Sequence, residues 1–512
     1  MAANAKGRIR KAVEMILGGD LHDLPPPAPQ IGSNRRLVIV SNRVNTPAQM
    51  KSNPGGLAVA MGAALHHRDA LWFGSSGELV DAPADAPRIS QEGNLVRALI
   101  DLPREDYNRY YAGFANGALW PLFHYRVGVV DFSHENYQAY LRINEEFARH
   151  LVPLLQPEDI IWIHDYQLIP LASCLRARGV TQRIGFFLHI PFPAPEVLTT
   201  LPVHGALMRA FADYDLIGFQ SASDQTAFTD YMLRERDDAT ASNGWIEAYG
   251  RRFQVGTFPI GIDTAVVAGR ARRAAGTART RELKDSLSGR KLVIGVDRLD
   301  YTKGLVGRFK AVERMFEEHA ELRRGVVVLQ IAPPTRGDVA EYRRVRSELN
   351  GLIGHINGRF GEPDLLPVRY LNRQYSQDIL FGYFRLSAAC LVTPLRDGMN
   401  LVVKEYIACQ DPDDPGIPIL SRFAGAGQQL DAALIVNPFD TAEMATALHR
   451  ALTMPLAERR ERHKSMIDVL RGYDIHRWRD LFLTELICVD DQAELPLAEP
   501  PRAAAALAEA GT

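Results

Sequence analysis

Hydrophobic runs of strand length alternate with longer helical patterns along most of the chain. The helical patterns include Tyr137–Leu155, Leu305–His319 and Val339–Ile353. Buried strands that alternate with helices are typical of parallel sheets covered on both faces. The pattern therefore predicts an α/β fold of doubly wound sheets. The runs that we interpret as strands are Leu37–Val40, Ile160–Ile163, Ile184–Leu188, Leu216–Phe219, Leu292–Val296, Val326–Ile331, Ala389–Thr393, Ile417–Leu420 and Leu434–Val436.

The chain is expected to fold into two domains, because 512 residues are too many for a single core. Proline and glycine interrupt the extended segment Phe258–Ile262, so we divide the chain there, into residues 36–258 and 259–470. Residues 1–35 are expected to be an extension with a stiff proline-rich spacer. Residues 491–512, rich in Ala, Pro and Glu, are expected to be disordered. A cleft between two domains commonly binds small molecules.

The composition excludes several classes of protein. Apolar residues make up 46% of the chain, charged residues 23%, and the net charge is −2. Nothing here favours attraction to nucleic acid or to a membrane surface, and no apolar run reaches membrane-spanning length. The four cysteines are scattered, which indicates free thiols in a reducing cytoplasm.

The segment Leu391–Tyr406 is the most informative stretch for function. An apolar run ends in a charged turn that contains Asp397, and a helical run with an internal carboxylate follows. Backbone N–H groups at such a helix start favour phosphate. Glu405 shares a helix face with Leu401, four residues earlier. One carboxylate could hold sugar hydroxyls and the other a ribose diol; a helix start capped by an acid is the alternative.

Two cations follow the predicted strand Leu292–Val296. They are Arg298 and Lys303, and Arg336 repeats the arrangement after the next strand. Positive charge at the carboxyl end of a strand could neutralise a departing diphosphate and so lower the barrier to its departure. The alternative is an ion pair at the surface between Arg298 and Asp300, which would contribute almost nothing to the free energy of folding.

Other motifs give weaker indications. Gly55 and Gly56 precede a helical run, so the backbone could approach a diphosphate there, although an ordinary turn is the alternative. The acidic run 411–414 resembles a metal site, but its prolines favour a solvated loop. The sequence contains no zinc-type Cys/His cluster, Walker lysine or nucleophile elbow. This inventory suits transfer from a phosphate-activated donor better than hydrolysis.

Polar groups also end two strands of the first half. His164 and Asp165 follow one strand, and His189 ends another, so all three are expected at the same rim of the sheet. Satisfied structural histidines are the alternative interpretation. Tyr111 and Trp120 could supply aromatic walls for a sugar, or could simply belong to the core.

Taken together, the chain resembles the trehalose-6-phosphate synthases, which are retaining glycosyltransferases of GT-B architecture. That architecture consists of two doubly wound Rossmann-like domains with an interdomain active-site cleft. The resemblance runs from about Arg36 to Leu486 and rests on motifs that occur in the same order. They are VIVSNR, NPGGLAVAMGAAL, LWPLFHYR, IIWIHDYQL, GFFLHIPFP, DYDLIGFQ, GVDRLDYTKG, IAPPTRGDV, GHINGRFG, TPLRDGMNLVVKEY and LSRFAGAGQQL.

The resemblance implies a reaction that serves trehalose biosynthesis and responses such as osmotic stress. Glucose would move from UDP-glucose to C1 of glucose 6-phosphate, giving α,α-trehalose 6-phosphate and UDP. Retention without an evident nucleophile suggests front-face attack, with the leaving diphosphate accepting the proton of the acceptor. We expect no metal and no other cofactor, a cytoplasmic homo-oligomer, and a helix over residues 471–490 that packs back on the first domain.

The resemblance also assigns residues to the site. Arg298, Lys303 and Gly56 would hold the diphosphate, Glu405 the ribose, and Asp397 the glucose. The full donor set is Gly55, Gly56, Arg298, Lys303, Tyr375 (through its backbone), Asp397, Leu401, Val402 and Glu405. The acceptor set is Arg43, Tyr111, Asp165 and Arg336. Trp120 and His189 match positions linked to anomer selection, and the catalytic set is Arg298, Lys303, Asp397, His189 and Trp120.

One departure from the family pattern bears on the acceptor. The family commonly has tryptophan in WFGWSG, where this chain has Ser75. Because an indole is lost at this position, a different phosphorylated acceptor, such as glycerol 3-phosphate, is an alternative to glucose 6-phosphate. A regulatory subunit that only senses sugar phosphates is a further alternative, but it should have lost donor-site charges that this chain keeps, including Arg298 and Lys303.

Overall fold

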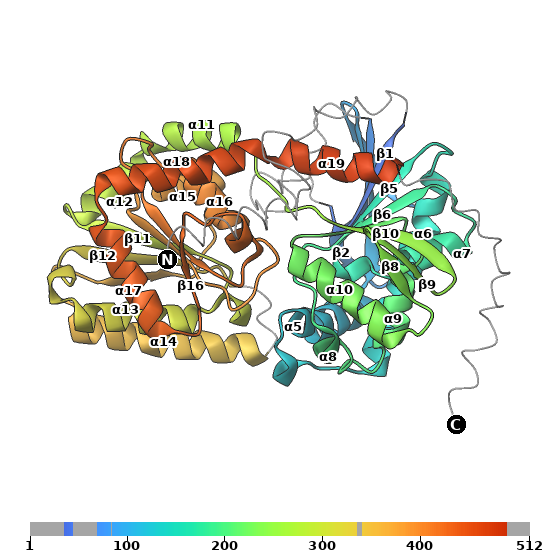
Figure 1. The fold of residues 1–512 in the computed structure, drawn as a ribbon, viewed down its shortest axis with the longest axis horizontal. Helices are drawn as coiled ribbons and strands as arrows, with labels where there is room; N and C mark the ends of the chain where they lie inside the picture. Colours follow the sequence, from blue (N-terminus) through green and yellow to red (C-terminus); the bar gives the residue numbers. More distant parts are fainter. Residues whose placement is uncertain (1–34, 45–68, 83, 335–339, 489–512) are drawn as a thin grey trace.

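The computed structural model describes residues 35–44, 69–82, 84–334 and 340–488. They form two lobes, each built on its own sheet, that lie side by side along the long axis of the molecule (Figure 1). The predicted N-terminal extension up to residue 34 and the predicted tail 491–512 lie outside the described residues. Among the described residues, no helix combines the length and the apolar character that crossing a bilayer requires.

The sheet of the N-terminal lobe has the strand order β3-β4-β2-β1-β5-β6-β7-β10-β9-β8. Its central strands are parallel and buried on both faces, which explains their continuous apolar runs. Antiparallel pairs stand at both edges. The strands are β1 (Leu37–Arg43), β2 (Ala70–Val80), β3 (Arg88–Glu92), β4 (Leu95–Pro103), β5 (Ile160–His164), β6 (Arg183–Phe187), β7 (Leu216–Phe219), β8 (Thr240–Ser242), β9 (Trp245–Ala248) and β10 (Arg251–Thr257).

The sheet of the C-terminal lobe is parallel throughout, with the order β13-β12-β11-β14-β15-β16. The chain order reverses between β11 and β14, as it does between β1 and β5 in the other lobe. Ligands of α/β sheets bind outside the carboxyl ends of the strands at such switch points. The strands are β11 (Lys291–Val296), β12 (Val326–Ile331), β13 (Val368–Leu371), β14 (Ala389–Val392), β15 (Ile417–Ser421) and β16 (Leu434–Val436).

Helices cover both sheets (Figure 1). Those of the first lobe are α4 (Arg104–Tyr107), the π-helix η1 (Asn108–Leu119), α5 (Trp120–Phe123), α6 (His134–Leu151), α7 (Leu171–Ala177), α8 (Pro195–Leu198), α9 (His204–Phe211) and α10 (Ala222–Glu235). Those of the second lobe are α11 (Thr264–Ala275), α12 (Ala278–Leu287), α13 (Leu305–Glu318), α14 (Ala340–Phe360), α15 (Gln377–Leu386), α16 (Leu401–Cys409), α17 (Thr441–Thr453) and α18 (Leu456–Gly472).

The last described helix, α19 (Ile475–Cys488), crosses from the second lobe to the first, as Figure 1 shows. It contacts β6 and β7. The Phe482 ring stacks on Trp162 at 4.7 Å, and the Trp478 ring lies 4.9 Å from Trp162. Burying each of these large side chains stabilises the fold by about 1.5–3 kcal/mol. Gly185 and Gly218 provide the room, because a Cβ at either would lie within 2.9 Å of Phe482.

Candidate active site

A buried arginine fixes the loops at the switch point of the C-terminal lobe. Arg308, on α13, is completely buried. Its guanidinium donates to Asp297 Oδ2 at 2.5 Å, at the end of β11, and to Thr393 Oγ1 at 3.0 Å, just beyond β14. A buried guanidinium is tolerated only when such partners satisfy it. Arg308 therefore holds together the two loops that carry Arg298 and Asp397. Sequence reasoning missed it, because its partners are distant along the chain.

Lys303 and Asp397 form an ion pair between these two loops. Lys303 ends the short helix η5 (Tyr301–Lys303), and its Nζ donates to Asp397 Oδ2 at 2.6 Å. Asn400 Nδ2 donates to the same oxygen at 3.2 Å. Burial by itself would raise the pKa of Asp397, but the Lys303 ammonium outweighs it and holds that pKa below its usual value. The carboxyl end of the C-terminal sheet thus carries an ionised carboxylate beside a cation.

Helix α16 begins at Leu401, shortly after Asp397. Asn400 has φ 76° and caps the helix, accepting from Val403 N at 3.2 Å. Leu401 and Val402 occupy the first turn, where backbone N–H groups have no partner within the helix and favour anions. Glu405 lies one turn further on, and burial raises the pKa of its carboxyl group to about 7.

Asp165 and His189 lie together at the carboxyl rim of the N-terminal sheet. Asp165 follows β5 and has φ 76°, a costly conformation for a residue with a side chain, of the kind found at functional sites. Its Oδ1 accepts from His189 N at 3.2 Å. The His189 ring contacts His164 Nδ1 at 3.0 Å, and burial lowers the pKa of His189 to about 3. His189 is therefore neutral at physiological pH.

Aromatic side chains form one wall of this rim. Trp120 begins α5, is buried, and packs at 4.1 Å on the ring of His124. Tyr111, half-buried on η1, stacks on Tyr107 at 5.1 Å. Burial lowers the pKa of His124 to about 4, so this ring is also uncharged. An apolar wall with few charges suits the face of a sugar ring.

The two lobes meet at these same residues. The Arg298 guanidinium lies 5.3 Å from the Trp120 ring, and Arg396 lies 3.8 Å from the Tyr125 ring. Gly398 approaches His189 so closely that a Cβ would lie 2.2 Å from the His189 carbonyl oxygen. The cationic loops of one lobe therefore contact the rim of the other lobe that carries Asp165, His189 and Trp120. Sequence reasoning did not single out Arg396 or Gly398, although both lie in the motif TPLRDGMN.

Arg43 and Ser75 lie side by side on two neighbouring strands of the N-terminal sheet. Arg43 is the exposed last residue of β1, and it pairs with Ser75 of β2. The Arg43 guanidinium packs over Gly77, where a Cβ would lie 2.7 Å from it. Ser75 is buried, and its Oγ accepts from Gly77 N at 3.0 Å. The serine that replaces the family's tryptophan thus lies beside a predicted phosphate-binding residue.

The remaining predicted residues are less informative. Tyr375 lies in the loop between β13 and α15, and its hydroxyl accepts from Arg373 Nε at 2.6 Å. Gly55, Gly56 and Arg336 lie outside the described residues, so the structure does not address their predicted roles.

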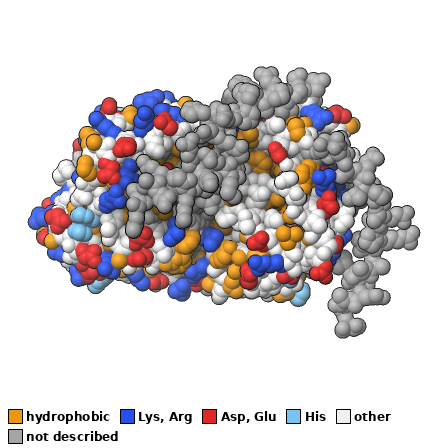
Figure 2. Space-filling view, in the orientation of Figure 1, with side chains coloured by type: hydrophobic (Ala, Val, Ile, Leu, Met, Phe, Trp, Pro, Cys, Tyr) orange, Lys and Arg blue, Asp and Glu red, His pale blue; other side chains and the backbone are white. Residues whose placement is uncertain are grey.

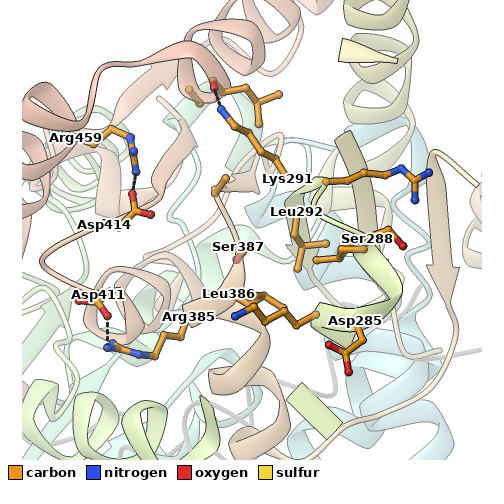
Figure 3. Close-up of a pocket in the computed structure, with 17 residues that line it drawn as sticks. Asp285, Ser288, Lys291, Leu292, Arg385, Leu386, Ser387, Asp411, Asp414 and Arg459 are labelled. Carbon is orange, nitrogen blue, oxygen red and sulfur yellow. Dashed lines mark hydrogen bonds and ion pairs between the residues drawn. The ribbon is translucent and has the colours of Figure 1, made fainter. Parts of the chain in front are cut away.

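A separate cavity of about 780 Å³ lies at the opposite edge of the C-terminal sheet (Figure 3). Two of its cations are neutralised by acids of the run 411–414. Arg385 pairs with Asp411 at 2.7 Å, and Arg459 pairs with Asp414 at 2.6 Å. Because the cavity opens at the amino ends of β11 and β14, away from the switch point, we assign it no part in catalysis.

The face of the molecule drawn in Figure 2 carries basic and acidic side chains in a mixture over both lobes. Such a surface has no extended basic field of the kind that recruits nucleic acid.

Comparisons with known proteins place this geometry in a family. The family model described as glycosyltransferase family 20 matches residues 30–487. A trehalose-6-phosphate synthase from Klebsiella pneumoniae subsp. pneumoniae is 47% identical over 461 residues, which cover 90% of this chain and 96% of that protein.

Two solved structures have the same fold. An α,α-trehalose-phosphate synthase (UDP-forming) from Burkholderia xenovorans in complex with glucose-6-phosphate has a TM-score of 0.86 and 48% identity, covering 88% of this chain and 100% of that one. A trehalose-6-phosphate protein from E. coli bound with UDP-2-fluoro glucose has a TM-score of 0.84 and 45% identity, covering 88% and 98%. The predicted α/β, GT-B-type fold is thereby confirmed, and the chain belongs to glycosyltransferase family 20.

Proposed function

We propose that this chain transfers glucose, with retention, from UDP-glucose to glucose 6-phosphate, forming α,α-trehalose 6-phosphate and UDP. The observation that carries the proposal is the contact between the loops at the switch points of the two sheets. Arg298 contacts the Trp120 ring, Lys303 pairs with Asp397, and Gly398, shortly before α16, abuts the backbone of His189. Support comes from relatives of nearly the same length that bear this synthase name, one bound to glucose-6-phosphate and one to a UDP-glucose analogue.

On the donor side, cations and helix amides would hold the diphosphate. Arg298 is exposed toward the cleft, and Lys303 stands beside it with its charge balanced by Asp397. A diphosphate at the first turn of α16 would also meet the amides of Leu401 and Val402. Glu405 lies one turn behind them, where its carboxylate would accept from the ribose hydroxyls. We assign Gly55, Gly56 and the Tyr375 backbone to the same subsite on the resemblance alone.

On the acceptor side, Arg43 and Arg336 would bind the 6-phosphate together with the Tyr111 hydroxyl. Asp165 would accept from an acceptor hydroxyl, and the surrounding structure must hold it at the rim, because its φ of 76° is costly for a residue with a side chain. The Trp120 wall would orient the ring of the sugar. This division gives each lobe one substrate, so closing the cleft would align the two for reaction.

The chemistry would rely on positioning and electrostatics. The acceptor oxygen bonds to the anomeric carbon as the bond from that carbon to the diphosphate breaks, and the acceptor proton passes to the leaving diphosphate oxygen. Arg298 and Lys303 would stabilise the charge that develops there. Asp397 is already engaged by Lys303 and Asn400, which favours holding glucose over attacking it. Neutral His189 would contribute a hydrogen bond and not an ionised acid.

The test is UDP release by purified protein. With UDP-glucose alone we expect only background release, and with glucose 6-phosphate added we expect turnover and trehalose 6-phosphate as the product. Turnover that does not depend on any acceptor would refute the proposal. Binding of sugar phosphates without affinity for UDP-glucose would instead support the regulatory-subunit alternative.

A second candidate acceptor deserves a direct comparison because Ser75, beside Arg43, is smaller than the tryptophan common in the family. Glycerol 3-phosphate should be assayed in parallel with glucose 6-phosphate. A higher kcat/KM for glycerol 3-phosphate would replace the proposed acceptor while keeping the same donor chemistry. ADP- and GDP-glucose belong in the same assay, to measure nucleotide preference.

We further propose that the reaction takes place in the cytoplasm without a metal cofactor, in a homo-oligomer. The four cysteines form no disulfide among the described residues, which agrees with a reducing compartment. Light scattering measures the oligomeric state, and turnover in the presence of a chelator tests the independence from metal.

A further inference from the structure

Three side chains that commonly bind metals gather at the edge of the C-terminal lobe opposite the active site. His319 caps the end of α13, Glu321 lies in the following 3-10 helix (Ala320–Leu322), and His449 lies near the end of α17. One potential ligand atom from each lies within 4.8 Å of the other two. Nothing in the proposed transfer reaction uses these residues.

The distances between these groups are too long for hydrogen bonds. Glu321 Oε1 lies 3.5 Å from His319 Nδ1 and 3.8 Å from His449 Nε2. Hydrogen bonds join such atoms at about 2.7–3.2 Å. Two ligands bonded to one tetrahedral Zn²⁺ at ~2.0–2.2 Å are themselves roughly 3.4 Å apart. The spacing therefore fits a shared ion better than direct hydrogen bonding.

The two rings would have to turn before both could bind one ion, because the in-plane nitrogen lone pairs of stacked imidazoles do not converge. The imidazoles of His319 and His449 stack at 3.8 Å with an interplanar angle of 15°. Their side chains are 27% and 32% exposed, so the rings have room to rotate toward an ion and water can complete its coordination. Two imidazoles and one carboxylate form a ligand set typical of Zn²⁺ and related transition metals, whereas Mg²⁺ and Ca²⁺ prefer oxygen alone.

We propose that His319, Glu321 and His449 bind one divalent transition-metal ion, and that the ion joins the ends of α13 and α17. Lys303 lies just before the start of α13, whose 14 residues span roughly 20 Å. The ion is consequently far from the sugar-transfer site and acts on stability, because it binds the folded arrangement and not the unfolded chain.

The experiment uses full-length protein without a histidine tag, because a tag would bind the same ions. Isothermal titration with Zn²⁺ should show one saturable site, and Co²⁺ should give the visible absorption bands of a bound ion. Zn²⁺ should raise the melting temperature without changing kcat. His319→Ala and His449→Ala should each weaken Zn²⁺ binding by more than ~10-fold, the loss that even outer-shell changes cause.

His355→Ala is the matched control. His355 lies on α14 of the same lobe and contacts Glu313 at 3.1 Å, so it offers one histidine and one carboxylate but no second ring. This variant should bind Zn²⁺ as the parent protein does. Equal Zn²⁺ affinity in the parent protein and in His449→Ala would overturn the proposal, and so would the absence of saturable binding at millimolar Zn²⁺. The calorimetric, spectroscopic and melting readouts are independent of glucosyl transfer.

Discussion

Gly398→Ala should open the cleft while leaving both lobes folded. Gly398 belongs to the loop after β14, and its nearest neighbours across the cleft are backbone atoms of the other lobe. A Cβ there would lie 2.2 Å from the His189 carbonyl oxygen and 3.0 Å from both the His189 carbonyl carbon and Ile190 Cα. Backbone atoms cannot rotate aside as a flexible side chain can, so the lobes themselves must shift.

The size of that shift sets the expected effect. Ordinary contact of a Cβ begins at 3.4 Å, so the added methyl group must move away from the His189 oxygen by roughly 1 Å. Because Asp397 precedes Gly398 and His189 contacts Asp165, the displacement separates donor groups from acceptor groups. A misplacement of that size costs about 100-fold in rate. We expect a fall in kcat of this order.

Steady-state UDP release measures kcat and both KM values, and thermal unfolding tests whether each lobe is intact. The control is Gly354→Ala on α14, where a Cβ meets nothing within 4 Å. That change should leave kcat unaltered and stabilise the helix by about 0.5–1 kcal/mol. A folded Gly398→Ala protein with kcat close to that of the parent would refute the argument that the lobes meet here during catalysis.

Three further changes test the assigned roles. Arg298→Ala should lower kcat at least ~100-fold, because it removes charge stabilisation from the leaving diphosphate. The rate of UDP release at saturating substrate measures this change. Lys303→Met should raise KM for UDP-glucose and also return the pKa of Asp397 toward its usual value, and unchanged donor affinity would contradict the assignment. Since burial raises the pKa of Glu405 to about 7, its carboxylate form is depleted below that pH. The kcat/KM for UDP-glucose should therefore fall as the pH drops below about 7, and Glu405→Gln should remove this dependence.

Most of the buried parallel strands were predictable because hydrogen bonding and burial act on them uniformly, although β2, whose first seven residues are also buried, was not among those predicted. The strands β5 and β12 are apolar except for His164 and Gln330 and are buried at every position, so each appears in the sequence as a nearly continuous apolar run. The edge strands β3 and β8 escaped notice, because all their residues are exposed and carry no such run. Apolar patterns in a sequence reflect burial, and no residue of these two strands is buried.

The candidate site was predictable in part for a related reason. Arg298 and Asp165 follow apolar strands, and parallel topology brings strand ends to one rim whatever the details of packing. The partners of these residues were not predictable. Lys303 and Asp397 are 94 positions apart, and no local pattern links them. The same holds for His319 and His449, whose contact depends on how α13 packs against α17.

The interface between the lobes explains why so many motif residues are needed at one place. Arg298 lies over the Trp120 ring, so a residue proposed to bind diphosphate also touches the proposed sugar wall. Gly398 likewise follows a proposed glucose ligand and abuts the His189 backbone. Any relative motion of the lobes must therefore change donor and acceptor contacts together. Since transfer requires both substrates to be aligned at once, this coupling makes productive geometry depend on closure of the cleft, and a change confined to the contact surface should act on kcat more than on either KM.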